Sequence, residues 1–208
     1  MLYKTIKEVV PAELIIKKSR FISILSPLSQ LQEVAQGLHY AQQKYPGANH
    51  YCFAYIIRQD GSILERCSDD GEPSGTAGWP ILNVLKKGSL ENVMAIVVRY
   101  FGGTLLGTGG LVKAYTQAVQ SAMNTAQIVS MEHCQKILVT LDYSHYGSFE
   151  KQFSKIMNQV TDIQYSDRVS LELWIAVDHV DHFMTKVDNL SLGTATTELR
   201  EEGFVPQR

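Results

Sequence analysis

The chain has 208 residues, of which 45% are hydrophobic and 19% are charged, and its formal net charge is −2. This length suits two modest domains, and this composition is that of a folded protein, so it excludes intrinsic disorder. The net charge argues against a basic surface that grips nucleic acid over the whole molecule. Basic side chains outnumber acidic ones by 12 to 10 as far as His133 and are outnumbered by 7 to 11 from Cys134 onward. An anion site is therefore expected in the first half.

The first half of the chain predicts strands and helices in mixed order. The expected elements are a strand at 20–28, a helix at 31–41 with Ser29 as its N-cap, a strand at 50–58, a hairpin partner at 63–67, a polar loop at 68–75, a helix at 76–87 capped by Ser74 or Thr76, a strand at 93–101, and a helix ending near 126. Asp60 and Gly61 suit the hairpin turn. The continuous apolar run 93–98 indicates a central strand covered on both faces.

The second half has a complete rhythm of its own. Its expected elements are a strand at 136–141, a helix at 146–157, strands near 163 and at 169–177, a helix at 179–190, and a strand at 194–200. This βαββαβ order is that of the split, ferredoxin-like unit. We therefore expect an α+β protein of two two-layer α/β domains, at residues 1–130 and 134–208.

Neither targeting signals nor the cysteine pattern indicates a specific function. The first residues lack the basic start and apolar run of a signal peptide, and no apolar stretch approaches the roughly 18 residues of a membrane span. The expected location is the cytoplasm, without membrane association. The three cysteines at 52, 67 and 134 are widely spaced and contain no CxxC. That pattern favours reduced thiols over a disulfide framework or a zinc ribbon.

A glycine-rich segment at 97–115 carries the strongest signal for binding. It has five glycines in nine positions between an apolar strand and an amphipathic helix, where converging amides at a helix start can hold an anion. Thr108 stands where a P-loop needs lysine, and Val112 stands where GxGxxG needs glycine, so neither nucleotide motif is present. The alternative is a tight strand-to-helix crossover. The predicted anion or nucleic-acid site comprises Arg20, Arg99, Tyr100, Gly102, Gly103, Gly107, Thr108, Gly109, Gly110 and Lys113.

An acidic loop at 68–78 offers three carboxylates within four residues, Asp69, Asp70 and Glu72. Such a group could hold a divalent cation such as Mg²⁺, although turn and helix-cap chemistry is the favoured interpretation. No other cofactor is predicted. The full acidic-loop site comprises His50, Asp69, Asp70, Glu72, Ser74, Gly75 and Thr76.

Catalysis has weaker support. Candidates for a nucleophile or base are scattered at His50, Cys52, Ser74 and Thr76, and neither GxSxG nor HExxH occurs. The histidines at 179 and 182 begin a predicted helix and are interpreted as solvated, without the companion ligands of a metal site. A binding protein is favoured over an enzyme.

Two strings, SDDGEPSGTAG at 68–78 and VRYFGG through GTGGLVKAY at 98–115, resemble the signatures of the IMPACT/YigZ family. The segments 17–22 and 49–55 fit the same family, and the tail resembles the smaller C-terminal domain of its bacterial members. The resemblance implies a first domain similar to domain IV of elongation factor G and a ferredoxin-like second domain similar to its domain V. In eukaryotes the family name is tied to restraint of a translation-initiation-factor kinase. Trp79 departs from the pattern, because a polar or basic residue is expected there.

The sequence is compatible with three functions. The first is a translation-associated regulatory protein that binds RNA, the ribosome or a ribosome-bound factor through the glycine-rich loop. The second is a small-molecule hydrolase or phosphoryl-handling enzyme that uses the acidic loop with a divalent metal. The third is a protein-interaction module, whose mark would be an exposed apolar patch around Trp79.

Overall fold

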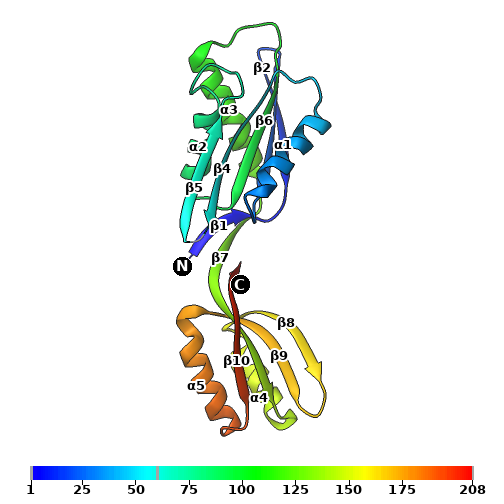
Figure 1. The fold of residues 1–208 in the computed structure, drawn as a ribbon, viewed down its shortest axis with the longest axis vertical. Coiled ribbons are helices and arrows are strands. Elements are labelled where there is room, and N and C mark those ends of the chain that lie inside the picture. The colour runs from blue at the N-terminus through cyan, green and yellow to red at the C-terminus, as the bar shows by residue number, and fades with distance from the viewer. Residues whose placement is uncertain (1, 60, 208) are drawn as a thin grey trace. The chain divides into compact units, whose positions relative to one another are not determined.

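A computed structural model describes residues 2–59 and 61–207. The chain divides into two compact units: the first spans Tyr3–Val129, and the second comprises the residues from Ser130 onward together with Leu2. The sheet of each unit, with its helices, is seen in Figure 1. None of the helices within these described ranges is both long and apolar enough to cross a membrane.

The first unit is built on an antiparallel sheet in the order β2-β3-β6-β4-β5. Its elements are β1 (Leu2–Ile6), β2 (Val10–Ile16), β3 (Ser19–Pro27), α1 (Gln32–Lys44), β4 (His50–Gln59), β5 (Ser62–Ser68), α2 (Gly78–Lys87), β6 (Val93–Tyr100) and α3 (Gly107–Thr125). The strands β1 and β2 were not predicted. Pro11 weakens the strand signal of β2, and it is tolerated because β2 lies at the edge of the sheet.

Both faces of this sheet are covered. Along β6, Ala95 and Val97 face the core that contains α2 and α3, whereas Met94, Ile96 and Val98 face the core beneath α1. Figure 1 shows α1 on one side of the sheet and α2 with α3 on the other. The first unit thus has three layers instead of the expected two, because a strand that is apolar on both faces must be covered on both.

The second unit has the predicted ferredoxin-like order. Its elements are β7 (Ile128–Leu141), α4 (Tyr143–Phe153), β8 (Met157–Tyr165), β9 (Val169–Ala176), the short 3₁₀ helix η1 (Val177–His179), α5 (Val180–Ser191) and β10 (Thr196–Pro206). The strands lie in the order β10-β7-β9-β8 and are antiparallel. Phe149, Phe153 and Phe183 of the two α-helices pack on this sheet. The α+β class is confirmed.

Two local details differ from the prediction. The helix α4 ends at Phe153, because Met157 already belongs to β8. Ser29 does not cap α1 with its side chain. Its amide instead donates to the Glu33 carboxylate at 2.7 Å. An acidic side chain of the first turn thus ties the preceding backbone to the start of the helix.

Candidate functional site

The acidic loop and the glycine-rich loop meet at one end of the sheet of the first unit, where they enclose a hollow of about 500 Å³. The antiparallel register brings this about, because His50 at the start of β4 pairs with Arg99 near the end of β6, and Arg99 pairs with Phe21 of β3. The hollow is lined by Asn49, His50, Gly71, Glu72, Pro73, Arg99, Phe101, Leu105, Leu106, Gly107, Thr108 and Leu111. Residues of both predicted sites therefore share one cavity.

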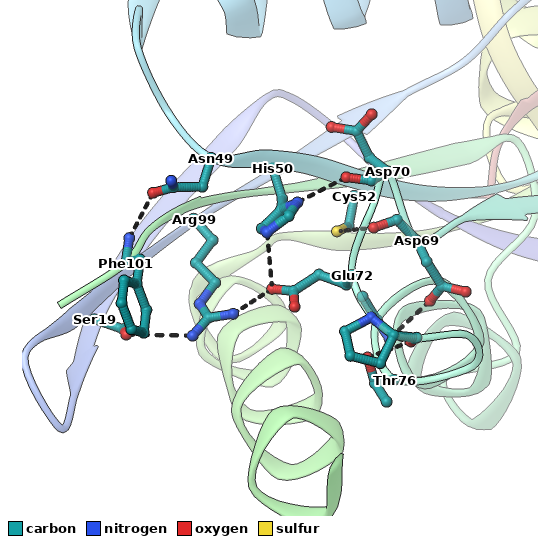
Figure 2. A network of polar contacts seen from close by, with 12 residues as sticks. Ser19, Asn49, His50, Cys52, Asp69, Asp70, Glu72, Thr76, Arg99 and Phe101 are labelled. Carbon is teal, nitrogen blue, oxygen red and sulfur yellow. Dashed lines mark hydrogen bonds and ion pairs between the residues drawn. The ribbon is translucent and has the colours of Figure 1, made fainter. Parts of the chain in front are cut away.

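A buried ion pair between Glu72 and Arg99 joins the acidic loop to β6 (Figure 2). The Glu72 side chain is 3% exposed and that of Arg99 is 6% exposed. Glu72 Oε1 also accepts a hydrogen bond from the Tyr115 hydroxyl at 2.8 Å and lies 3.9 Å from His50 Nε2. The second guanidinium nitrogen of Arg99 is 3.4 Å from Ser19 Oγ. The glutamate is thus the centre of a network drawn from three strands, a loop and α3.

This network changes the part that Arg99 can play. Its charge is compensated by Glu72, and its guanidinium lies over the rings of Phe21 and Phe101, at 5.4 and 5.6 Å from their centroids. A buried, paired arginine on aromatic rings holds structure together. It is not the free counter-charge that the sequence suggested.

Asp69 fixes the acidic loop onto the start of α2. Its carboxylate accepts hydrogen bonds from the amides of Gly75, Ala77 and Gly78 at 2.8 to 2.9 Å. Burial alone would raise the pKa of Asp69, but these amides outweigh it and the pKa is lowered. The predicted caps were wrong: Thr76 is buried and its hydroxyl donates to the Pro73 carbonyl at 2.6 Å, while α2 has no side-chain cap at its own N-cap position.

The three carboxylates of the loop do not converge. Asp69 is bound by the amides of α2, the carboxylate of Asp70 accepts the Tyr51 amide at 2.6 Å, and Glu72 is paired with Arg99. Figure 2 shows Asp70 turned away from Glu72. Within residues 2–59 and 61–207, no group of three or more histidine, cysteine, aspartate or glutamate side chains is arranged to hold a metal ion. The three carboxylates of this loop are therefore not arranged as a single cation site.

The glycines of the second loop serve different purposes. Gly102 lies against the β2–β3 turn, where an added Cβ would stand 2.0 Å from the carbonyl carbon of Lys18. Gly103 and Gly107 have φ of +81° and +72°, a region that favours glycine. Gly109 meets neither constraint: its φ is ordinary for a helix and an added Cβ would contact nothing within 4 Å. The tight crossover explains Gly102, Gly103 and Gly107, but not Gly109.

The unpaired cations near this loop are lysines. Lys17 and Lys18 form the β2–β3 turn with φ of 45° and 67°, and Lys113 projects from α3; all three are exposed. By contrast, Arg20 makes a bidentate ion pair with Glu13, at 2.7 and 2.9 Å, and lies over the ring of Tyr100. The positive charge available to a ligand therefore comes from lysines, two of which stand outside the predicted set.

The candidate nucleophile is poorly suited to reaction. Cys52 is buried, its thiol donates to the Asp69 carbonyl at 2.9 Å, and burial raises its pKa to about 12. Such a thiol is almost wholly protonated at neutral pH. His50 Nδ1 lies 2.7 Å from the Asp70 carbonyl oxygen, which can only accept, so this nitrogen carries a proton. Ser74 is exposed on the loop.

Sequence reasoning missed three contributors to the site. Asn49 lies just before β4, and its Oδ1 accepts a hydrogen bond from the Phe101 amide at 2.8 Å, which ties the glycine-rich loop to this strand. Phe101 lines the hollow, and the Tyr115 hydroxyl donates to Glu72. Tyr115 does carry a signal, since it follows Leu111 at the spacing of one helical face, which places it toward the core. Asn49 and Phe101 have no comparable signal in the sequence.

Comparison with known proteins decides the family. Residues 17–123 match the model of the Impact N-terminal domain, a span that contains both motif loops, and residues 139–194 match a domain of unknown function, DUF1949. The chain belongs to the IMPACT family. The IMPACT family member YvyE of Bacillus subtilis is 37% identical over 190 residues, 90% of this chain and 87% of the relative. A Haemophilus influenzae member is 33% identical over 202 residues, 97% and 98% of the two chains.

A solved structure shares the fold. The crystal structure of a hypothetical protein superposes with a TM-score of 0.63 at 29% identity, and the match covers 96% of this chain and 98% of the other. The family that the motifs indicated is confirmed. The likeness of each domain to those of elongation factor G stays a prediction.

Proposed function

We propose that this protein acts in translation as a binding protein that contacts RNA through the first turn of α3 and the lysines around it. The translational setting comes from the family resemblance, and the contact comes from the geometry. The location predicted for such a protein is the cytoplasm, where the translation apparatus works.

One observation carries the proposal: the first turn of α3 is exposed, and it combines free amides with nearby lysines. Its N-cap, Leu106, makes no side-chain cap bond, and the turn contains no acidic residue. Free amides at a helix start favour anions. Lys18 lies against Gly102 at the entrance of this loop, and Lys113 follows on the helix. A phosphate at this turn meets amides and lysines together.

Gly109 supports the same site. Glycine destabilises a helix by about 1 kcal/mol relative to alanine, and neither conformation nor packing requires it at this position. A bare backbone in the first turn lets a ligand approach the amides closely. The enzyme alternative loses its main support, since the carboxylates meant to hold its metal are engaged elsewhere.

The decisive experiment is co-sedimentation with ribosomes over a series of salt concentrations. We expect salt-sensitive binding that is weakened in Lys18→Ala/Lys113→Ala, with the slope of log K against log salt reduced by about 1.5, because each lost phosphate contact removes about 0.7 to 0.9. The control Lys151→Ala/Lys155→Ala removes the same charge from exposed positions of the second unit and should bind as the wild type does. Failure of the wild type to sediment, or equal behaviour of the two variants, would reject the proposal.

A second variant separates binding from stability. Gly109→Ala should raise the free energy of unfolding by about 0.4 to 1 kcal/mol, as alanine suits a helical position with free space. The same methyl group should weaken ribosome association, because it stands over the exposed amides. A variant that is more stable and binds with unchanged affinity would show that the amides of this turn are not the contact.

A further inference from the structure

A separate groove lies between α2 and α3, next to Trp79, the aromatic residue of α2. Trp79 is 56% exposed, and beside it lies a hollow of about 290 Å³. The hollow is lined by Gly75, Trp79, Pro80, Asn83, Val84, Lys87, Val112, Thr116 and Gln120. A single exposed aromatic residue is ordinary, but one that borders a hollow between two helices marks a surface shaped for a ligand.

The walls of the groove follow helical spacing. On α2, Trp79, Asn83 and Lys87 are each four residues apart, and on α3 Val112, Thr116 and Gln120 repeat the same interval. Residues at this spacing lie on one face of a helix. The two helices lie on the same side of the sheet (Figure 1), and the two stripes line opposite sides of the hollow. Hydrophobic grooves between helices are a common docking place for one face of an amphipathic helix.

Among the described residues that line the hollow, the only charged side chain is a cation, Lys87. Neither α2 nor α3 contains an aspartate or a glutamate. Lys86 is engaged with Glu65 at 2.7 Å, whereas Lys87 is exposed at the far end of the groove. Trp79 and Val112, which is 39% exposed, form the apolar part. The groove therefore has an apolar region and a cationic region, separated along α2 by eight residues, or about 12 Å.

We propose that this groove docks an acidic amphipathic helix of a partner protein. A large apolar side chain of that helix enters the hollow beside Trp79 and Val112, and a carboxylate two turns away meets Lys87. A nucleic acid fits less well, because a phosphate backbone needs cations along its path, and the walls between Trp79 and Lys87 are neutral. This docking uses other side chains than the proposed RNA contact and stands without it.

The test uses a designed helical peptide labelled with a fluorophore. The peptide carries two leucines on adjacent turns of one face and a glutamate two turns further along the same face, in an alanine- and glutamine-rich background. Fluorescence anisotropy should rise with added protein, and Trp79→Ala should weaken binding at least tenfold. Tyr40→Ala, which removes an exposed aromatic side chain from α1 on the opposite face of the sheet, should leave it unchanged. Lys87→Glu should weaken the binding of this peptide and strengthen the binding of a peptide that has lysine in place of the glutamate.

Several results would overturn the proposal. One is the absence of an anisotropy change at protein concentrations up to about 1 mM, where a missing signal means that binding contributes less than about 4 kcal/mol. Another is equal binding by Trp79→Ala and Tyr40→Ala. Tighter binding of an oligouridylate that Trp79→Ala abolishes would assign the groove to nucleic acid. A dimer that sedimentation detects in the wild type and not in Trp79→Ala would assign it to a second copy of the chain.

Discussion

Replacing Glu72 with leucine should destabilise the first unit strongly, although leucine is apolar and the site is buried. The substitution leaves the Arg99 guanidinium buried without its counter-charge and the Tyr115 hydroxyl without its acceptor. Removing one partner of a buried ion pair costs about 3 to 5 kcal/mol, and an unsatisfied buried hydroxyl costs about 1 to 3 kcal/mol. A domain is stable by about 5 to 15 kcal/mol, so the loss is a large fraction of the whole.

The double variant Glu72→Leu/Arg99→Met gives the sharper result. It removes both charges together, although the Tyr115 hydroxyl still loses its acceptor, so it should be more stable than Glu72→Leu by about 2 to 4 kcal/mol. Glu72→Gln should fall between the wild type and the leucine variant, because the amide oxygen still accepts from Tyr115.

Urea unfolding measures these differences. The chain has two tryptophans, at 79 and 174, so a Trp174→Phe background leaves Trp79 to report on the first unit alone. A loss of under about 1 kcal/mol in Glu72→Leu, or a double variant no more stable than the single one, would refute the view that the pair is a buried and mutually dependent unit.

Three further results are expected. Gly102→Ala should unfold at a lower urea concentration than the wild type, because its methyl group would collide with the β2–β3 turn. Gly109→Ala, whose methyl group meets open space, should unfold at a higher urea concentration. Equal midpoints for the two variants would contradict the close packing at Gly102. The wild type should have a larger free energy of unfolding than Asp69→Asn, and this difference should be greatest above pH 3.8, the ordinary pKa of the carboxyl group. It should shrink as the pH falls through the lowered pKa of the folded state. A difference that does not change with pH would show that the charge of the Asp69 carboxylate does not hold the loop on α2. With a thiol reagent at pH 8, Cys52, whose pKa is about 12, should react only on unfolding and after the half-buried Cys67, and mass spectrometry gives the order of modification.

Much of the architecture was determined by the sequence, because local patterns carry it. The apolar run 93–98 predicted a strand covered on both faces, and β6 is buried from Val93 to Arg99. The second unit kept its predicted order of strands and helices, since each element has its own periodicity and turn residues. Strand β2 was missed because Pro11 interrupts its pattern, and β2 can pair with β3 despite this proline because it lies at the edge of the sheet.

The chemistry of the site was decided by tertiary structure. Glu72 and Arg99 are 27 residues apart, and nothing in the sequence indicates that they form a pair. The antiparallel register of β4 and β6 brings Arg99 to the end of the sheet where the acidic loop lies. Because both side chains are buried there, their charges must compensate each other. The same folding sends Asp69 to the amides of α2 and leaves Lys113 in solvent. Charge and hydropathy patterns report which residues are present, but which charges neutralise each other depends on distances that only the packed chain sets.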